Sequence, residues 1–172
     1  TAKRLPERPF PGLDVSGARI LVTGFGVSGY AIVDQTLQRG AHVTAVDASR
    51  SESNLERAKV LETLGARILL GEEHTRALPT NADGSPFDVV VTSPGWRPDH
   101  PLLVAAQNEG IEIWSEIELA RRMQKADGPA WLAVTGTNGK TTVVTMLESI
   151  LQHAGVRAVA AGNVGLPLIE AA

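Results

Sequence analysis

The chain has 172 residues, of which 43% are hydrophobic and 20% are charged, and its formal net charge is −3. This composition is typical of a folded globular protein and excludes the disordered, collagen-like and coiled-coil classes. Because no basic run occurs, we expect neither nucleic acid nor a membrane surface as a partner. The chain has no cysteine and only four scattered histidines, which excludes a disulfide framework and a zinc site.

The first residues are polar and rich in proline, unlike a signal peptide, and no apolar run reaches the roughly 18–20 residues of a membrane span. We therefore expect a cytoplasmic protein, and we take it to be a monomer. Residues 166–172 have the pattern of a first helical turn, so we expect the chain to be a fragment of a longer protein.

Short, continuously apolar runs alternate with amphipathic stretches along the chain. The apolar runs predict buried strands at residues 19–23, 42–46, 67–70, 87–92, 111–114, 131–135 and 156–160. The amphipathic stretches predict helices at residues 28–39, 54–64, 101–109, 116–124 and 140–154, with Asp99 and Ser115 placed to begin two of them. This alternation predicts an α/β fold with a Rossmann-like, parallel, doubly wound sheet.

A polar stretch at residues 124–129, ending in Gly128 and Pro129, separates the first five predicted strands from the last two. We therefore place one domain at residues 1–127 and the start of a second at residues 128–172. Two strands do not form a stable doubly wound layer in water, so we expect the second domain to be incomplete.

The first glycine-rich turn, Gly24-Phe25-Gly26-Val27-Ser28-Gly29, lies between the first predicted strand and helix, and Asp47 ends the second strand. This spacing is that of a dinucleotide-binding fingerprint, in which the glycines permit a tight turn and a close ligand, and the helix N-terminus attracts a phosphate. Asp47 is expected to accept hydrogen bonds from a ribose or a base. A purely structural tight turn is the alternative, and the pattern does not say which nucleotide would bind.

The second glycine-rich turn lies between the predicted strand at 131–135 and the helix at 140–154. It reads Gly136-Thr137-Asn138-Gly139-Lys140-Thr141-Thr142, a shortened P-loop that predicts the start of a P-loop ATPase-type central domain. We expect its backbone N–H groups to bind the phosphates of ATP, Lys140 to reach the β and γ phosphates as the catalytic residue, and the Thr141 hydroxyl to ligate Mg²⁺. The alternative is an ordinary helix start capped by Thr142.

Two phosphate-binding turns in one chain predict transfer of a phosphoryl group to a molecule that itself carries a nucleotide or a similar anion. An NAD-dependent oxidoreductase domain needs only the first turn and is the main alternative. A non-catalytic nucleotide-sensing domain is a third hypothesis. Both alternatives leave Lys140 and its two neighbouring hydroxyl groups unexplained.

Five motifs in order resemble the Mur ligase family. They are the first glycine turn, Ser93-Pro94-Gly95 with His100-Pro101, Glu116-Ile117-Glu118-Leu119, the loop from Thr135 to Thr142, and Gly162-Asn163-Val164-Gly165-Leu166-Pro167. The similarity covers almost the whole chain after about residue 17. Asn138, with Asp47 and the Ser93 turn, favours the members that add D-glutamate.

The resemblance implies an ATP-dependent, amide-forming ligase of peptidoglycan precursor synthesis that adds D-glutamate to UDP-MurNAc-L-alanine through an acyl phosphate. It implies that the first domain holds the UDP moiety at Gly26, Val27 and Ser28, with Asp47 near the uracil. Ser93, Pro94 and Gly95 would line the same pocket, and Asn163 would contact the substrate near its reacting end.

The resemblance also places the remaining Mg²⁺ ligands, a carbamylated lysine and the D-glutamate site beyond Ala172, so we expect residues 1–172 to bind UDP compounds but ligate nothing. For Asn163 an ordinary Gly-Asn turn is an equal alternative. The roles of Arg50 and His100 stay open: Arg50 follows Asp47 at a different spacing from the family pattern, and His100 fits either a pocket rim or a helix start.

Overall fold

The computed structural model describes residues 12–81, 83–163 and 165–171, and it contains a single parallel sheet in those residues. The five strands run in the order β3-β2-β1-β4-β5. Their bounds are Arg19–Thr23 (β1), His42–Asp47 (β2), Arg67–Leu70 (β3), Val89–Thr92 (β4) and Glu112–Ser115 (β5). The predicted parallel α/β sheet is therefore confirmed, although β4 and β5 begin later than the apolar runs indicate.

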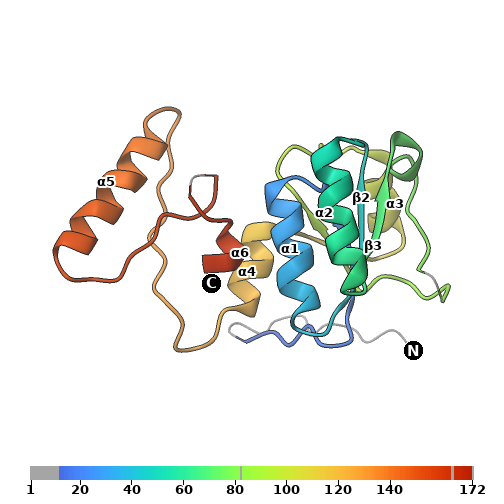
Figure 1. Ribbon diagram of the computed structural model, residues 1–172, viewed down its shortest axis with the longest axis horizontal. Coiled ribbons are helices and arrows are strands. Elements are labelled where there is room, and N and C mark those ends of the chain that lie inside the picture. The colour runs from blue at the N-terminus through green and yellow to red at the C-terminus, as the bar shows by residue number, and fades with distance from the viewer. Residues whose placement is uncertain (1–11, 82, 164, 172) are drawn as a thin grey trace.

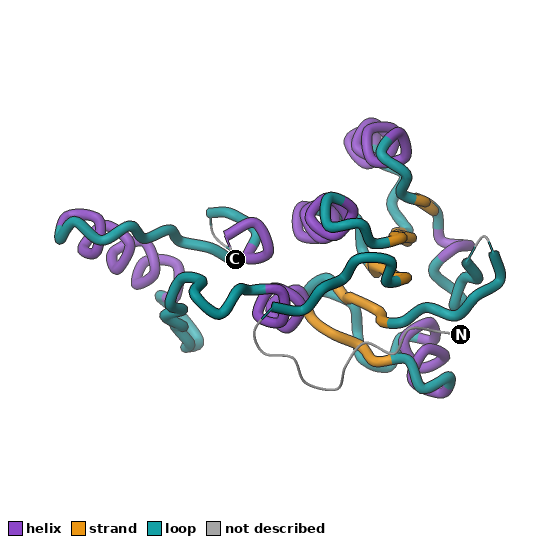
Figure 2. Tube along the Cα trace, turned by 90° about the horizontal axis from the view of Figure 1, so that it is seen from below, coloured by secondary structure: helices purple, strands orange, loops and turns teal. Residues whose placement is uncertain are grey.

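Helices lie on both sides of the sheet (Figures 1 and 2). The helices α1 (Val27–Leu37), α2 (Glu52–Thr63) and α4 (Glu116–Met123) pack on one face, and α3 (Pro101–Asn108) packs on the other. Within β1, Ile20 and Val22 face the first group of helices, whereas Leu21 faces α3. The central strand is buried on both sides, which is why its sequence is continuously apolar rather than alternating.

Hydrogen-bonding side chains begin three of these helices. The Ser51 hydroxyl accepts from Asn54 N–H at the start of α2, and the Ser115 hydroxyl accepts from Glu118 N–H at the start of α4. At α3 the cap is the His100 ring, whose Nδ1 accepts from Leu102 N–H at 3.3 Å. Asp99 instead pairs with Arg97, so the expectation that Asp99 begins this helix is wrong by one residue.

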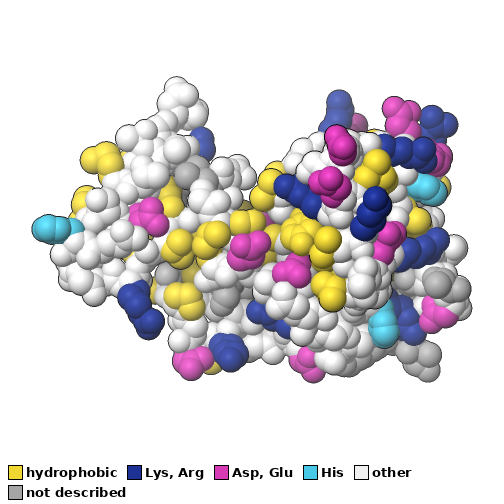
Figure 3. Space-filling view, viewed as in Figure 1, with side chains coloured by type: hydrophobic (Ala, Val, Ile, Leu, Met, Phe, Trp, Pro, Cys, Tyr) yellow, Lys and Arg dark blue, Asp and Glu magenta, His cyan; other side chains and the backbone are white. Residues whose placement is uncertain are grey.

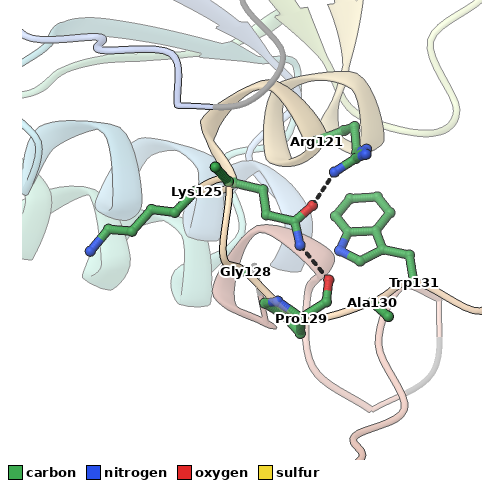
Figure 4. A pocket seen from close by; sticks show the side chains of 8 residues that line it. Arg121, Lys125, Gly128, Pro129, Ala130 and Trp131 are labelled. Atoms are coloured by element: carbon green, nitrogen blue, oxygen red, sulfur yellow. Dashed lines mark hydrogen bonds between the residues drawn. The ribbon is translucent and has the colours of Figure 1, made fainter.

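The linker between the sheet and the remaining residues is held by side chains (Figure 4). Gln124, almost fully buried, accepts from Arg121 and donates to the Pro129 carbonyl. The guanidinium of Arg121 lies 5.8 Å from the centre of the Trp131 ring. A Cβ on Gly128 would lie 2.7 Å from the Gln124 side chain, so a glycine is needed here. The stretch 124–129 is therefore an ordered turn.

The residues after the linker form helices but no strand in the part of the chain that the structure describes. They comprise α5 (Lys140–His153) and the short α6 (Leu168–Ala171), and α5 projects away from the sheet (Figure 1). The predicted strands at 131–135 and 156–160 are therefore wrong for this structure. A strand needs a neighbour to pair its N–H and C=O groups, and among the described residues neither segment has one.

The apolar face of α5 is left at the surface (Figure 3). Val143, Met146 and Ile150 are each about half exposed or more, and none of the residues of α5 is buried. In contrast, Ile169 of α6 is 2% exposed and belongs to the core formed by α1, α2 and α4. The second part of the chain thus packs on α1 and α4 through α6, while α5 keeps its apolar face unpaired. None of the helices in the described residues combines the length and apolar character that a membrane span requires.

Candidate functional site

The first glycine turn lies at the carboxyl end of β1, where β1 has β2 on one side and β4 on the other. The chain leaves β1 through α1 toward β2, and it returns to the opposite side of β1 only at β4. This is the point where the strand order reverses, and open α/β sheets bind their ligands in the crevice outside it. The backbone N–H of Ser93 donates to Thr23 at 2.9 Å, which brings the Ser93 turn beside the first glycine turn.

The three glycines of the first turn have different structural reasons. A Cβ on Gly29 would lie 1.9 Å from the Gly24 carbonyl oxygen, so α1 packs against its strand only because Gly29 has no side chain. Gly24 has a φ of +92°, and a Cβ there would lie 3.0 Å from the Ser93 hydroxyl and 3.1 Å from the Trp96 indole nitrogen. Gly26 has an ordinary φ of −72°, and a Cβ on it would meet nothing within 4 Å. The protein leaves the space over Gly26 open.

Asp47 fastens the first glycine turn to the end of β2. One carboxylate oxygen accepts from Phe25 N–H at 2.6 Å, and the other accepts from Ser49 N–H at 2.7 Å. A carboxylate has further lone pairs, so Asp47 retains capacity for a ligand hydroxyl or N–H group. Its observed contacts make it a positioning residue for the turn as well as a candidate ligand contact.

Arg50 lies beside this site but is engaged with β3 and the turn after it. Its Nε donates to the Leu70 carbonyl at 2.9 Å, and its guanidinium pairs with Glu73. A hydrogen bond to its own backbone N–H, and to a lesser degree the charge on Arg50, lower the pKa of the Glu73 carboxyl. These contacts account for Arg50 without a ligand, and the capping contact of His100 likewise accounts for that residue.

The starts of α1 and α5 carry no side-chain cap, whereas α2, α3 and α4 each have one. Neither α1 nor α5 has an acidic residue in its first turn. The first N–H groups of a helix have no partner within the helix, and together with the helix dipole they attract anions. Among the described helices α1 to α5, the two without a cap are those that follow the two glycine-rich turns.

The second glycine turn folds around the side chain of Lys140, the first residue of α5. The ammonium of Lys140 donates to the Gly136 carbonyl at 2.5 Å and to the Thr137 carbonyl at 3.3 Å. An ammonium has three N–H donors, so one remains for a phosphate oxygen. Gly139 precedes the helix with a φ of +77°, which requires a glycine. No cap from Thr142 forms, so the interpretation of Thr142 as a simple helix cap is wrong.

The residues predicted to bind ATP and Mg²⁺ fit that use by their chemistry. Gly136, Thr137, Asn138 and Gly139 form an exposed loop, and Thr141 presents an exposed hydroxyl residue in the first turn of α5. Backbone N–H groups and a lysine at a helix start suit a phosphate, and a threonine hydroxyl oxygen beside that phosphate suits Mg²⁺. The described residues hold no cluster of three acidic, histidine or cysteine side chains suited to a metal ion.

Asn163 lies in a narrow loop between α5 and α6. Gly162 N–H donates to the Leu166 carbonyl at 2.8 Å, and Ala161 forms an isolated parallel bridge with Leu166. A Cβ on Gly165 would lie 2.4 Å from the Ala160 carbonyl oxygen, so this loop also needs a glycine. Asn163 itself is exposed. The loop geometry explains the glycines, while the Asn163 side chain stays a candidate ligand contact.

Two family models match the chain on either side of the linker. A model described as Mur ligase MurD-like, N-terminal domain, matches residues 18–115, and one described as Mur ligase middle domain matches residues 134–169. The first alone covers more than half of the chain. The chain belongs to the Mur ligase family.

Two curated ligases of the same name are similar to this chain. The UDP-N-acetylmuramoylalanine--D-glutamate ligase of Thermobifida fusca is 52% identical over 160 residues, which are 93% of this chain and 33% of that protein. The ligase of the same name from Frankia casuarinae is 45% identical over 156 residues, covering 91% of this chain and 31% of that protein. The chain thus spans about a third of the length of these relatives.

A solved Mur ligase shares the fold. The UDP-N-acetylmuramate:L-alanyl-gamma-D-glutamyl-meso-diaminopimelate ligase from Neisseria meningitides has a TM-score of 0.51 and 23% identity, with 86% of this chain and 42% of that chain covered. The sequence did not predict two contacts that the structure shows. Trp96 lies against Gly24, and Glu116 accepts from the backbone of α6. The Pro94-Gly95 turn at the end of β4 is a sequence signal for the first contact, and the second has none.

Proposed function

We propose that this chain acts within an ATP-dependent ligase that joins D-glutamate to UDP-MurNAc-L-alanine in peptidoglycan precursor synthesis. The similarity to curated ligases of that name supports the proposal. The structural observation that carries it is the pair of uncapped helices, α1 and α5, each preceded by a glycine-rich turn. One turn would hold the UDP diphosphate, and the other would hold ATP.

The residues of the first turn bind and orient the substrate in this proposal. The open space over Gly26 admits the diphosphate, and Val27 and Ser28 supply N–H groups at the start of α1. Asp47 would accept from the uracil with the lone pairs that its backbone contacts leave free. Ser93, Pro94 and Gly95 would border the same pocket. Asn163 would contact the substrate near its reacting end.

The residues of the second turn serve the phosphoryl group in this proposal. Bound ATP supplies the γ-phosphoryl group that turns the L-alanine carboxylate into a reactive acyl phosphate, and Mg²⁺ neutralises charge on the phosphates. Lys140, held by two loop carbonyls, keeps its remaining N–H donor fixed toward the phosphates. The Thr141 hydroxyl would be a Mg²⁺ ligand. The D-glutamate amine then displaces phosphate and forms the amide bond.

The test measures phosphate release by the full-length protein with ATP, Mg²⁺, UDP-MurNAc-L-alanine and D-glutamate. We expect release only when all four are present, and Lys140→Ala should lower the turnover by about 100-fold because a preorganised donor is lost. Lys59→Ala, which removes an exposed lysine of α2, is the matched control and should keep wild-type turnover. Release that does not need UDP-MurNAc-L-alanine, or full turnover in Lys140→Ala, would contradict the proposal.

NAD is the second ligand to test, because the first turn also fits a dinucleotide. Calorimetric titration of the full-length protein with UDP, ATP and NAD separates the two proposals. We expect heat from UDP and ATP but none from NAD. Binding of NAD without a response to UDP would favour the oxidoreductase domain.

A further inference from the structure

Trp96 is held over the first glycine turn by the turn that ends β4. Pro94 and Gly95 occupy the central positions of a tight turn, and Gly95 has a φ of +112°. The backbone N–H of Trp96 donates to the Ser93 carbonyl at 3.5 Å. Proline followed by a glycine of positive φ is typical of a type II turn, which reverses the chain. The indole nitrogen therefore lies 3.1 Å from the position of a Cβ on Gly24.

The Trp96 ring is fixed from its other side. Its centre lies 4.4 Å from that of the His100 ring at an angle of 53°, and it also packs against the apolar core beneath α3. The His100 ring is in turn oriented by its hydrogen bond to Leu102 N–H. A ring that is packed and oriented in this way keeps its N–H in one direction. A hydrogen bond from it to a ligand would therefore cost little side-chain entropy of Trp96.

The three tryptophans of the chain differ in what their side chains contact. Trp114 donates its indole N–H to Glu112 at 2.6 Å, and the Trp131 ring lies against the Arg121 guanidinium. For the Trp96 indole N–H, the described residues provide no hydrogen-bond acceptor. Because the Trp96 ring is only half-buried and its N–H is not used within these residues, that N–H is available to a ligand bound at this place.

We propose that the indole N–H of Trp96 donates a hydrogen bond to a diphosphate oxygen of the UDP-linked substrate. This inference rests on the proposed function of the first glycine turn. The acceptor is an anion because the same end of β1 carries the uncapped start of α1, with no acidic residue in its first turn. The negative charge of Asp47 is already hydrogen-bonded by two backbone N–H groups, which reduces its repulsion of a phosphate.

The test compares the binding of UDP and of uridine to the full-length protein by calorimetry. Trp96→Phe keeps an aromatic ring and removes the N–H donor, so it should raise the Kd for UDP about tenfold and leave the Kd for uridine unchanged. Trp131→Phe removes an indole N–H at the linker and should bind both ligands as the wild type does. Equal UDP affinity in Trp96→Phe and wild type, or an equal loss for UDP and uridine, would overturn the inference.

A second measurement needs no substitution. In the wild-type protein labelled with ¹⁵N-tryptophan, UDP should shift the indole N–H resonance of Trp96 and leave those of Trp114 and Trp131 in place. Saturating UDP that moves none of the three resonances overturns the role of Trp96 alone. Failure of the wild-type protein to bind UDP would instead overturn the proposed function together with this inference.

Discussion

Gly26 and Gly29 stand three positions apart in the same turn, yet the structure gives them opposite reasons. Gly29 is needed by the protein, since a Cβ there would lie 1.9 Å from a backbone oxygen of Gly24. Gly26 is not, since a Cβ there meets nothing and its φ suits any residue. A glycine with no reason in the fold indicates a surface that a ligand approaches closely.

These two glycines should therefore respond differently to the same substitution. Gly29→Ala should lower the free energy of unfolding by about 3 kcal/mol, because α1 must move off its strand. Gly26→Ala should change it by less than about 0.5 kcal/mol but weaken UDP binding. Urea denaturation and calorimetry of the full-length protein measure both effects. A stable Gly29→Ala variant, or a Gly26→Ala variant with wild-type UDP affinity, would contradict this account.

At the scale of elements, a carboxylate of α4 holds α6, which lies about 50 residues later in the chain. Glu116 is 6% exposed, and one of its carboxylate oxygens accepts from Leu168 N–H at 2.7 Å and Ile169 N–H at 3.4 Å. It thereby satisfies backbone donors at the start of a helix only four residues long. The sequence places Glu116 only in the first turn of a predicted helix, and the tertiary structure alone shows its partners in α6.

Removing that carboxylate should loosen α6. Glu116→Ala leaves two N–H groups of α6 without their acceptor, so we expect faster hydrogen exchange at Leu168 and Ile169 and a loss of about 1–3 kcal/mol of stability. Glu116→Gln keeps an acceptor oxygen and should lose less. Glu62→Ala, an exposed acid of α2, is the matched control. Unchanged exchange at Leu168 in Glu116→Ala would show that α6 is held by its apolar contacts alone.

At the scale of the whole molecule, the two parts of the chain differ in how much surface they bury. The sheet and its four helices enclose two apolar clusters, whereas α5 buries no residue. An amphipathic helix gains most of its stability from packing its apolar face. We therefore expect α5 to be the least stable of the helices α1 to α5. The boundary between two domains at residues 127 and 128 stays a prediction.

The chain of residues 1–172 alone should accordingly bind UDP but form no amide. Calorimetry should give a UDP affinity within a few fold of that of the full-length protein, because the first turn and Asp47 belong to the packed sheet. Hydrogen exchange should be fast along α5 and slow in β1 and β2. Amide formation by this chain with ATP, or strong protection of α5, would contradict the prediction.

The sequence by itself determined the parallel sheet, its helices and the first glycine-rich turn. Buried strands must be apolar, and a strand-glycine-helix pattern has few backbone solutions, so these features depend on neighbouring residues. It did not determine whether residues 131–135 and 156–160 form strands, because a strand exists only beside another strand. Only the tertiary structure decided which distant groups Trp96, Asp47 and Glu116 contact. Their partners lie 22 to 72 residues away in sequence, and packing alone brings such distant groups together.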